Sequence, residues 1–522
     1  MTSNLLSMIQ QELKMDFDEI ISEVGEAGNG TCTADQMERH LWQQMLKLGG
    51  RLMQLFFEAG SQAAQRDEVY TEEGQRIPYH CDRKRKYISI FGELSIRRPY
   101  FYHKEVGSQI PLDARLGLAD DCYSDFVREL HEELSVFVPY EKTEQIPGRL
   151  LGIHLSKRVL QEFVSEDATD VQNYYEQLAP PPAAEEGSIL VVQADGKGVP
   201  MIRQSNTGQK VRLRRGEARS RKKAANVTAL YTIQSAPRTP VEVLQSLLSR
   251  EQGEEDPSWS SERHRPQNKQ LWATMAGKQV ALEHLAHQVD KREGAHILER
   301  VMLADGDRHL QRHLQETFPD FSLILDFIHA YEYLWKAANV LYGEGNEARL
   351  AWVTDQTRLL LNNRAEQLID HLRQLAASST SSHKQKQLNK VANYFEKNVA
   401  FMQYATYLQR GWPIASGVIE GACRHFVKDR LELSGMRWSY DGAESLLHLR
   451  AVAINDDWDD YHHYRKQCRQ QRLYNCDWPT NIFDEAPASH QSPVRQSEPD
   501  VVYERRSLNE PQSDYCTLPL AT

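Results

Sequence analysis

The stretch that decides the fold runs from Glu299 to Leu341 and reads ERVMLADGDRHLQRHLQETFPDFSLILDFIHAYEYLWKAANVL. Its apolar pattern predicts a strand, a helix, a second strand and a second helix, at 301–304, 307–317, 321–325 and 327–341. Each strand ends at an acid, Asp305 and Asp326. Because ligands of an α/β sheet bind beyond the carboxyl ends of its strands, these two acids are candidate site residues.

A similar strand precedes this stretch in SILVVQADGKGVPMI, where Ile189 to Val192 leads to Asp195. Gly196 and Gly198 predict a turn after that acid into another strand. The remaining expected elements are strands at 199–202 and 227–233, an irregular insertion at 235–268, and helices at 270–289, 347–376, 384–409, 417–431 and 440–454.

Glu420 joins Asp195 and Asp305 as the third acid of a candidate set, and it lies on the helix expected at 417–431. The expected elements follow the order of a ribonuclease H-like domain: a strand meander, a helix, a strand that ends at an acid, a helix, a strand, and then a helix that carries Glu. Three carboxylates suit such a site because hard divalent ions take oxygen ligands. Each acid has a simpler reading: Asp195 and Asp305 precede glycines, as in turns, and Glu420 can pair with Arg424.

The N-terminal part reads as mostly helical. Leu41, Met45, Leu48, Leu52 and Leu55 form an apolar seam on a helix at 34–58, which fits burial within its own domain or a coiled-coil dimer. A β-hairpin is expected at 87–102, with Gly92 at its turn. Helices at 124–134, at 140–151 and from Ser156 onward permit a helix-turn-helix.

The expected fold class is therefore α/β: a ribonuclease H-like mixed five-stranded sheet with an all-helical insertion, preceded by a mostly helical DNA-binding domain with a β-hairpin. The proline-rich APPPAAEEG marks the clearest boundary, because three consecutive prolines disfavour helix and sheet. The division is 1–178 for DNA binding and oligomerisation, 179–187 as linker, 188–342 as the first catalytic part, 343–410 as insertion, 411–460 as the second catalytic part, and 478–522 as a disordered tail.

Charge and composition limit the setting. The net charge is -11, yet ten bases and one acid lie between Lys197 and Lys223, so a local basic surface for phosphate is expected. A solvated face is the alternative reading of such a run. The seven cysteines never form a C-x-x-C pair, and no apolar run reaches the roughly 18 residues of a membrane span. With no basic, apolar leader pattern, we expect a cytoplasmic, nucleoid-associated protein.

Several stretches together resemble a known family. The chain is similar to DDE transposases of bacterial insertion sequences in the stretches ILVVQADGKGV, VMLADGD, FPDFSLILDFIHAYEYLWKAA and PIASGVIEGACRHFVKDR with SGMRWS. The greatest similarity is to the Kra-type family, relatives of the Mutator-like group, and IFGELSIRRPYF and PLDARLGL extend it over roughly residues 35 to 460. The resemblance implies Asp195, Asp305 and Glu420 as a catalytic triad that holds two Mg²⁺ or Mn²⁺ ions.

The family also carries a C/D-x-x-H signature, which Asp326 and His329 match in its Asp form. Residues three apart share a helix face, so Asp326 can orient the imidazole of His329. Asp326 as a helix cap and His329 as a packed first-turn residue is the alternative. A rival assignment makes Asp326 the second metal ligand and Asp305 a turn residue; we favour Asp305, since its strand is expected to neighbour the first.

The expected activity is that of a DNA transposase that binds terminal inverted repeats, hydrolyses a phosphodiester and joins the freed end to target DNA, as a homodimer or larger assembly. Alternatives are a resolvase-type nuclease and a domesticated DNA-binding protein without catalysis. Trp438 also fits core packing, and the bases near Glu420 also fit ion pairs with Asp429 or Glu432. The candidate DNA contacts are Arg212, Arg214, Arg215, Lys222, Lys223, Arg424, Lys428, Arg437 and Trp438.

Overall fold

The computed structural model describes residues 2–30, 32–71, 73–202, 222–251 and 265–478. Up to Trp478 the chain forms one compact unit. The candidate contacts Arg212, Arg214 and Arg215, and the expected tail beyond Trp478, lie outside the described residues. Within the described ranges, no helix combines the length and apolar character that a bilayer span requires.

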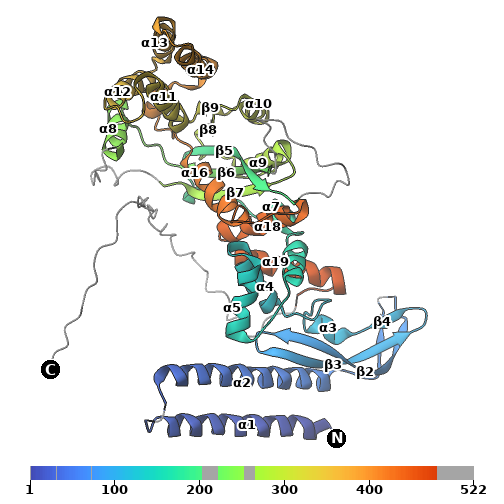
Figure 1. The fold of residues 1–522 in the computed structure, drawn as a ribbon. Coiled ribbons are helices and arrows are strands. Elements are labelled where there is room, and N and C mark those ends of the chain that lie inside the picture. The colour runs from blue at the N-terminus through green and yellow to red at the C-terminus, as the bar shows by residue number, and fades with distance from the viewer. Residues whose placement is uncertain (1, 31, 72, 203–221, 252–264, 479–522) are drawn as a thin grey trace, which may run out of the picture. The chain divides into compact units, whose positions relative to one another are not determined.

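The chain begins with two antiparallel helices, α1 (Thr2–Ala27) and α2 (Ala34–Ala63). A capping box at Thr33 starts α2, because the hydroxyl of Thr33 accepts from the backbone N–H of Gln36 and the Gln36 side chain accepts in return. The helix α2 also packs on an antiparallel sheet of four strands in sequence order (Figure 1). These strands are β1 (Glu68–Tyr70), β2 (Arg76–Ser89), β3 (Gly92–His103) and β4 (Gly107–Gln109).

Five helices follow this sheet, and hydroxyl caps from Ser124 and Ser156 begin two of them. Their bounds are α3 (Pro111–Arg115), α4 (Asp125–Phe137), α5 (Tyr140–Leu151), α6 (Lys157–Asp167) and α7 (Val171–Gln177). The proline-rich segment then includes one 3-10 turn, η1 (Ala183–Glu185). The carboxylate of Glu186 is buried and pairs with Arg292, so this segment is held against the sheet region.

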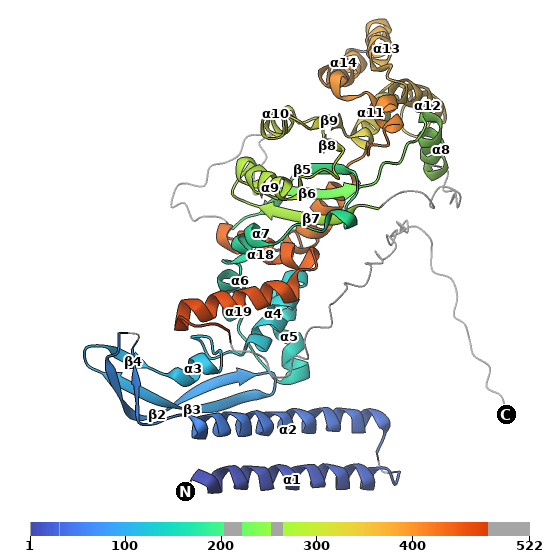
Figure 2. The ribbon, with the colours of Figure 1, turned by 180° about the vertical axis from the view of Figure 1, so that it is seen from behind.

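The central sheet has five strands in the order β7-β6-β5-β8-β9 (Figures 1 and 2). The strand β6 runs antiparallel to β5 and β7, whereas β5, β8 and β9 are parallel to one another. The expectation of a mixed five-stranded sheet is confirmed. The bounds are β5 (Ile189–Pro200), β6 (Lys222–Ile233), β7 (Gln267–Thr274), β8 (Glu299–Ala304) and β9 (Ser322–Leu325).

The turn expected at Gly196 and Gly198 is wrong. The strand β5 continues through both glycines, because β6 pairs with it along its whole length, from Ile189 with Ile233 to Pro200 with Lys222. A Cβ at Gly198 would lie 3.0 Å from the side chain of Lys222, so the absence of a side chain there serves close packing.

The helix expected at 270–289 is also wrong in its first residues, 270–274, which belong to the edge strand β7. Its residues Leu271 to Thr274 are buried as β7 pairs with β6, and α9 (Lys278–Arg292) begins only after Gly277. Part of the irregular insertion expected at 235–268 is the helix α8 (Pro240–Glu251). The error at β7 arises because pairing with the distant strand β6 outweighs the local pattern.

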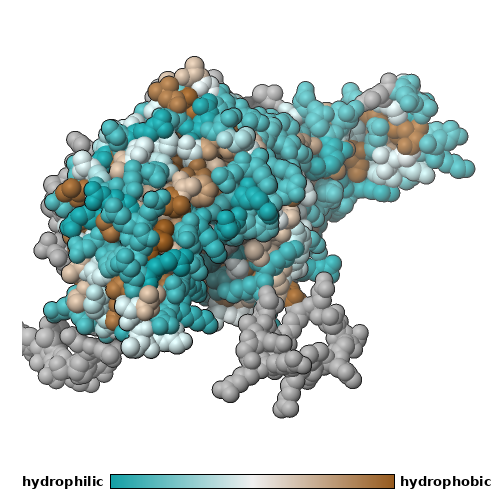
Figure 3. Space-filling model, turned by 90° about the horizontal axis from the view of Figure 1, so that it is seen from above, coloured by the Kyte–Doolittle hydropathy of each residue, from teal (hydrophilic) through white to brown (hydrophobic). Residues whose placement is uncertain are grey.

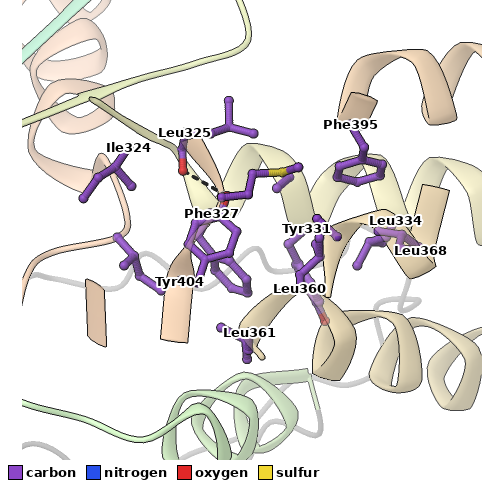
Figure 4. Packing of buried hydrophobic residues seen from close by; sticks show 14 of the residues in the cluster. Ile324, Leu325, Phe327, Tyr331, Leu334, Leu360, Leu361, Leu368, Phe395 and Tyr404 are labelled. Atoms are coloured by element: carbon purple, nitrogen blue, oxygen red, sulfur yellow. Dashed lines mark hydrogen bonds between the residues drawn. The ribbon is translucent and has the colours of Figure 1, made fainter. Parts of the chain in front are cut away.

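The two faces of the sheet carry separate cores. Val191 and Val301 face the core built with α11 (Phe327–Tyr342), whereas Leu190 and Met302 face α9 and α10 (Arg308–Thr317). The core beside α11 continues into further helices, which are α12 (Ala348–Leu361), α13 (Ala365–Ser378), α14 (Ser382–Asn398), η3 (Val399–Phe401) and α15 (Tyr404–Gln409). The hydroxyl of Tyr404 on α15 donates to the carbonyl of Leu325 at 3.0 Å (Figure 4).

Three helices expected to be continuous are interrupted, and the one expected at 384–409 is divided into α14, η3 and α15. The helix expected at 347–376 breaks at Asn363, whose φ of 60° is left-handed and whose amide bonds Thr406 and Ala405. The helix expected at 417–431 contains a π-helical stretch, and its parts are α16 (Gly417–Ala422), η4 (Cys423–Lys428) and α17 (Asp429–Leu431). The last expected helix is confirmed as α18 (Tyr440–Ile454), and α19 (Trp458–Tyr474), which the sequence analysis did not include, follows it. The face in Figure 3 is mostly hydrophilic with small separate hydrophobic areas.

Asn455 at the end of α18 completes the edge of β7. Its amide accepts from the backbone N–H of Leu271 at 2.8 Å and donates to the Leu271 carbonyl at 3.0 Å and to the Tyr175 hydroxyl at 2.9 Å. Asn455→Ala leaves the backbone N–H and carbonyl of Leu271 without these partners and is expected to lower the free energy of unfolding by about 2–4 kcal/mol. Urea denaturation measures this change. The exposed Asn393→Ala is the control and should change stability by less than about 0.5 kcal/mol; equal losses would contradict the assignment.

Candidate active site

Three acids stand in one row at the carboxyl ends of the parallel strands. The β5–β8 register pairs Gln193 with Leu303, and two residues further it sets Asp195 beside Asp305. The β8–β9 register pairs Ala304 with Leu325, and the next position sets Asp305 beside Asp326. The backbone N–H of Asp326 donates to the carbonyl of Ala304 at 2.9 Å, which extends this ladder. The row faces the side of the sheet that carries Val191 and Val301.

Asp305 lies in a tight turn between β8 and α10. One of its carboxylate oxygens accepts from the backbone N–H of Asp307 at 2.9 Å. Burial raises the pKa of Asp305, and the negative charge of Asp195 raises it further. The two carboxylates therefore share negative charge that a divalent cation would neutralise, and their oxygens are ligands that such an ion accepts.

Gly306 is needed here for close approach rather than for a left-handed turn. A Cβ at Gly306 would lie 2.3 Å from the ring of Tyr394 on α14. That ring stacks on Tyr333 of α11, with 3.6 Å between ring centroids. A helix from the 343–410 segment is thus packed directly against the turn that carries Asp305.

Glu420 reaches the same edge from α16. The backbone N–H of Ile419 donates to the side-chain oxygen of Gln193 at 2.9 Å, which fixes α16 on β5 two residues before Asp195. The thiol of Cys423, one turn beyond Glu420, donates to Asp195 at 3.3 Å. The π-helical stretch η4 begins at Cys423, and such stretches commonly occur at functional sites.

Among the described residues, the one set of three possible metal ligands whose ligand atoms lie within 4.8 Å of one another surrounds Asp326, and it includes neither Asp195 nor Asp305. One oxygen of this buried carboxylate caps α11 through Ile328 at 2.8 Å, and the other bonds His329 at 3.0 Å and the hydroxyl of Ser416. Glu420 lies 3.8 Å from His329, and one ligand atom from each of Asp326, His329 and Glu420 lies within 4.8 Å of the others. The cap and the orienting contact expected as alternatives for Asp326 therefore occur together.

The charges in this group are coupled. The hydrogen bond to Asp326 raises the pKa of His329 to about 9, so the imidazole is protonated at neutral pH. Burial acts to raise the pKa of Asp326, but its bonds to His329 and Ser416 hold that pKa below its usual value. Burial and the charge of Asp326 raise the pKa of Glu420. Asp326 and His329 thus form an internal ion pair, while Glu420, whose side chain is 44% exposed, remains accessible.

A pocket of about 340 Å³ opens beside Asp195 and Asp305. It is lined by the middle of β5, the first half of β6 and the starts of α9 and α10. Lys278 lies on its wall and pairs with Asp307 at 2.9 Å. Asp195 and Asp305 thus border this cavity, whereas Asp326, His329 and Glu420 are not in its lining.

The described candidate DNA contacts differ in exposure. Arg424, Lys428 and Arg437 are exposed, and so are Lys222 and Lys223. Lys222 pairs with Glu432 at 2.5 Å, and the ammonium of Lys223 lies 4.1 Å from the ring centroid of Tyr440. Trp438 is buried, and its indole donates to the carbonyl of Leu431 at 3.0 Å, so it has the core position that the sequence left open as the alternative to a base contact.

Sequence reasoning missed three residues that position the acids: Gln193, Ser416 and Tyr394. Gln193 is a polar residue inside an apolar strand, and Ser416 directly precedes the helix expected at 417–431. A polar side chain in a buried strand was the available signal, since buried polar groups need partners. Tyr394 carried no sequence signal.

No protein-family model matches this chain, and no curated protein matches it. Among solved structures, the chain is similar to the Drosophila P element transposase strand transfer complex, with a TM-score of 0.24 and 9% sequence identity over 70% of this chain and 84% of that one.

Proposed function

We propose that this chain is a DDE DNA transposase of the Kra-type insertion-sequence group, with a ribonuclease H-like catalytic domain. The observation that carries the proposal is the row of Asp195 and Asp305 on adjacent parallel strands, with Glu420 brought to the same edge by the bond between Ile419 and Gln193. Such a convergence of carboxylates at strand ends suits metal-assisted phosphodiester chemistry.

The proposed metal ligands are Asp195, Asp305 and Glu420. When bound, two Mg²⁺ or Mn²⁺ ions supply activation of the attacking oxygen and stabilisation of the leaving oxygen. Asp326 is assigned a positioning role instead, because both of its oxygens already bond within the protein. The protonated His329 beside Glu420 offers a positive charge to a phosphate that approaches the acids.

DNA binding is assigned to the N-terminal part and to exposed bases around the site. The hairpin of β2 and β3 presents Arg83, Lys84 and Lys86 as exposed bases, and the guanidinium of Arg83 lies 3.4 Å from the ring centroid of Tyr100. A twisted two-stranded ribbon with bases fits a DNA groove or backbone. Arg424 and Lys428 follow Glu420 on the same helical segment, where they suit the phosphates next to the cleaved bond.

The test uses the purified full chain and DNA from the borders of its own gene, where terminal inverted repeats are expected. With Mg²⁺ or Mn²⁺, the chain should cut at the repeat end and join a precleaved 3′-hydroxyl end to a target plasmid. Cutting without joining would indicate a nuclease instead. Binding without cutting in either metal would indicate a DNA-binding protein without catalysis, and no specific binding to any border DNA would overturn the proposal.

A further inference from the structure

The pocket beside the acids extends onto the face of the sheet that carries α9 and α10. On β5, Ala194 and Gly196 flank Asp195, so they face the opposite side of the sheet from its carboxylate. Thr228 and Asn226 on β6 pair with Ala194 and Gly196 and therefore share that side. Ala194 belongs to the core that α9 and α10 form with the sheet. The interior of the pocket thus lies behind the row of acids.

Small and apolar residues form much of the pocket wall. From the helices, it is lined by Ala281, Leu282 and Leu310, all buried. On the sheet, Gly196 has no side chain, and a Cβ at this position would meet no atom within 4 Å, so the space above it is open. A volume of about 340 Å³ and an apolar lining with a few polar groups are typical of sites for small organic groups.

Two polar side chains in the pocket lack a protein partner. Asn226 is 7% exposed and Thr228 is 2% exposed. Neither the amide of Asn226 nor the hydroxyl of Thr228 has a hydrogen-bond partner among the described residues. Buried polar groups normally have a partner, because an unpaired one costs free energy. The donors and acceptors of these two side chains are therefore available to a ligand.

The charges at the border of the pocket limit the kind of ligand. Asp195, Asp305 and Asp307 are in the lining, and Lys278 already pairs with Asp307 at 2.9 Å. A free anion inside the pocket would be repelled by these carboxylates. A neutral planar group with hydrogen-bonding edges meets the amide of Asn226 without that repulsion. A nucleobase is such a group, and in DNA it is attached beside a phosphate.

We propose that the pocket receives one nucleobase of the cut DNA strand, turned out of the duplex next to the phosphate at the acids. The inference rests on the proposed function, which places that phosphate at Asp195 and Asp305. The amide of Asn226 bonds the edge of the base, a pairing that asparagine makes in direct base readout. Leu282 and Leu310 cover its apolar face. Burial and these bonds offset the free energy of unstacking the base.

The test uses the full chain and DNA from the borders of its own gene, with the fluorescent base 2-aminopurine placed in turn at each position next to the cut bond. Binding is measured in Ca²⁺, so that the DNA stays uncut. Stacking quenches this base, and none of the described lining residues is aromatic. Its entry into the pocket should therefore raise the fluorescence about fivefold or more at one position.

Ala281→Leu fills part of the pocket and should remove most of this rise. Val280→Leu is the matched control, because Val280 is 44% exposed on the same helix; it should keep the rise. A rise that Ala281→Leu retains would place the base elsewhere and overturn the proposal. Circular dichroism checks that both variants fold, and if Ala281→Leu does not, the comparison with DNA that lacks one base decides.

That comparison separates contact with the base from a structural role. Asn226→Ala should slow cleavage of intact DNA by about tenfold, the effect of one lost hydrogen bond. On DNA that lacks only the base at the reporting position, it should cleave as fast as the wild type, because no base remains to be bound. Equal slowing on both DNAs would overturn the proposal.

Failure of this inference differs from failure of the proposed function. If the wild type binds and cuts border DNA while the fluorescence stays low at every position, the pocket holds no base and the proposed function stands. If the wild type binds no border DNA, the proposed function itself is overturned.

Discussion

Asp195→Asn and Asp305→Asn are each expected to lower the rate of DNA cleavage by on the order of 10³-fold or more, since groups that act as one catalytic unit are lost together. Asparagine keeps the shape of the side chain but removes the charge that a divalent ion requires. Asp305 is partly buried beside Asp195, so its neutral substitute also removes a repulsion. The variant protein should melt no lower than wild type in the absence of divalent ions.

The readout is the formation of cut ends from labelled DNA, together with binding of the same DNA in Ca²⁺. Binding should persist in both variants. Asp307→Asn serves as the control, because Asp307 is an exposed helix cap two residues away that pairs with Lys278; it should retain cleavage. Asp326→Asn decides between the two assignments. If it abolishes metal binding while Asp305→Asn cleaves normally, Asp326 is the ligand and Asp305 a turn residue.

Arg450→Leu is expected to lower the free energy of unfolding by on the order of 3 kcal/mol or more, because it leaves several buried carbonyls without a donor. The guanidinium of Arg450 donates to the carbonyl of Phe426 at 2.7 Å, to that of His425 at 2.6 Å and to that of Val136. Burial, together with the nearby positive charge of Arg430, lowers the pKa of Arg450 to about 9. The residue thus joins the end of α4 to η4, directly after Glu420.

Chemical denaturation followed by circular dichroism measures this loss. Arg358→Leu is a matched control, because Arg358 is exposed and bonds only the neighbouring Asp355 in the described contacts, at 2.9 Å. It should change stability by less than about 1 kcal/mol. Similar midpoints for the wild type and Arg450→Leu would show that water replaces the lost donor, which contradicts the proposed structural role.

The elements with strong local signals were predictable. The strands at 301–304 and 321–325 and the helices after them correspond to β8, α10, β9 and α11, because long apolar runs, caps and glycines agree there with the final packing. The errors concern β5, read as turning at Gly196, and β7, read as helix. In both cases the deciding partner is β6, which local sequence does not reveal.

For the candidate site, the acidic residues could be predicted from the sequence, but the hydrogen bonds that hold them in position could not. Acids after strands and a glutamate on a helix could be named from spacing alone. The bond from Ile419 to Gln193 joins residues 226 positions apart, and Ser416 meets Asp326 across 90 positions. Such contacts depend on the tertiary fold, and local patterns in a single sequence do not show which distant residues will meet.

The contact between Tyr394 and Gly306 has a consequence for how such a protein can change. The helical segment that carries Tyr394 contributes directly to the candidate site, because the aromatic ring of Tyr394 packs against the turn at Gly306, next to Asp305. If these helices were shortened or exchanged, this packing contact would be lost and the turn that carries Asp305 would no longer be held in position. The sequence of the segment can therefore vary where it lies away from the sheet, whereas Tyr394 and Gly306 must be retained together.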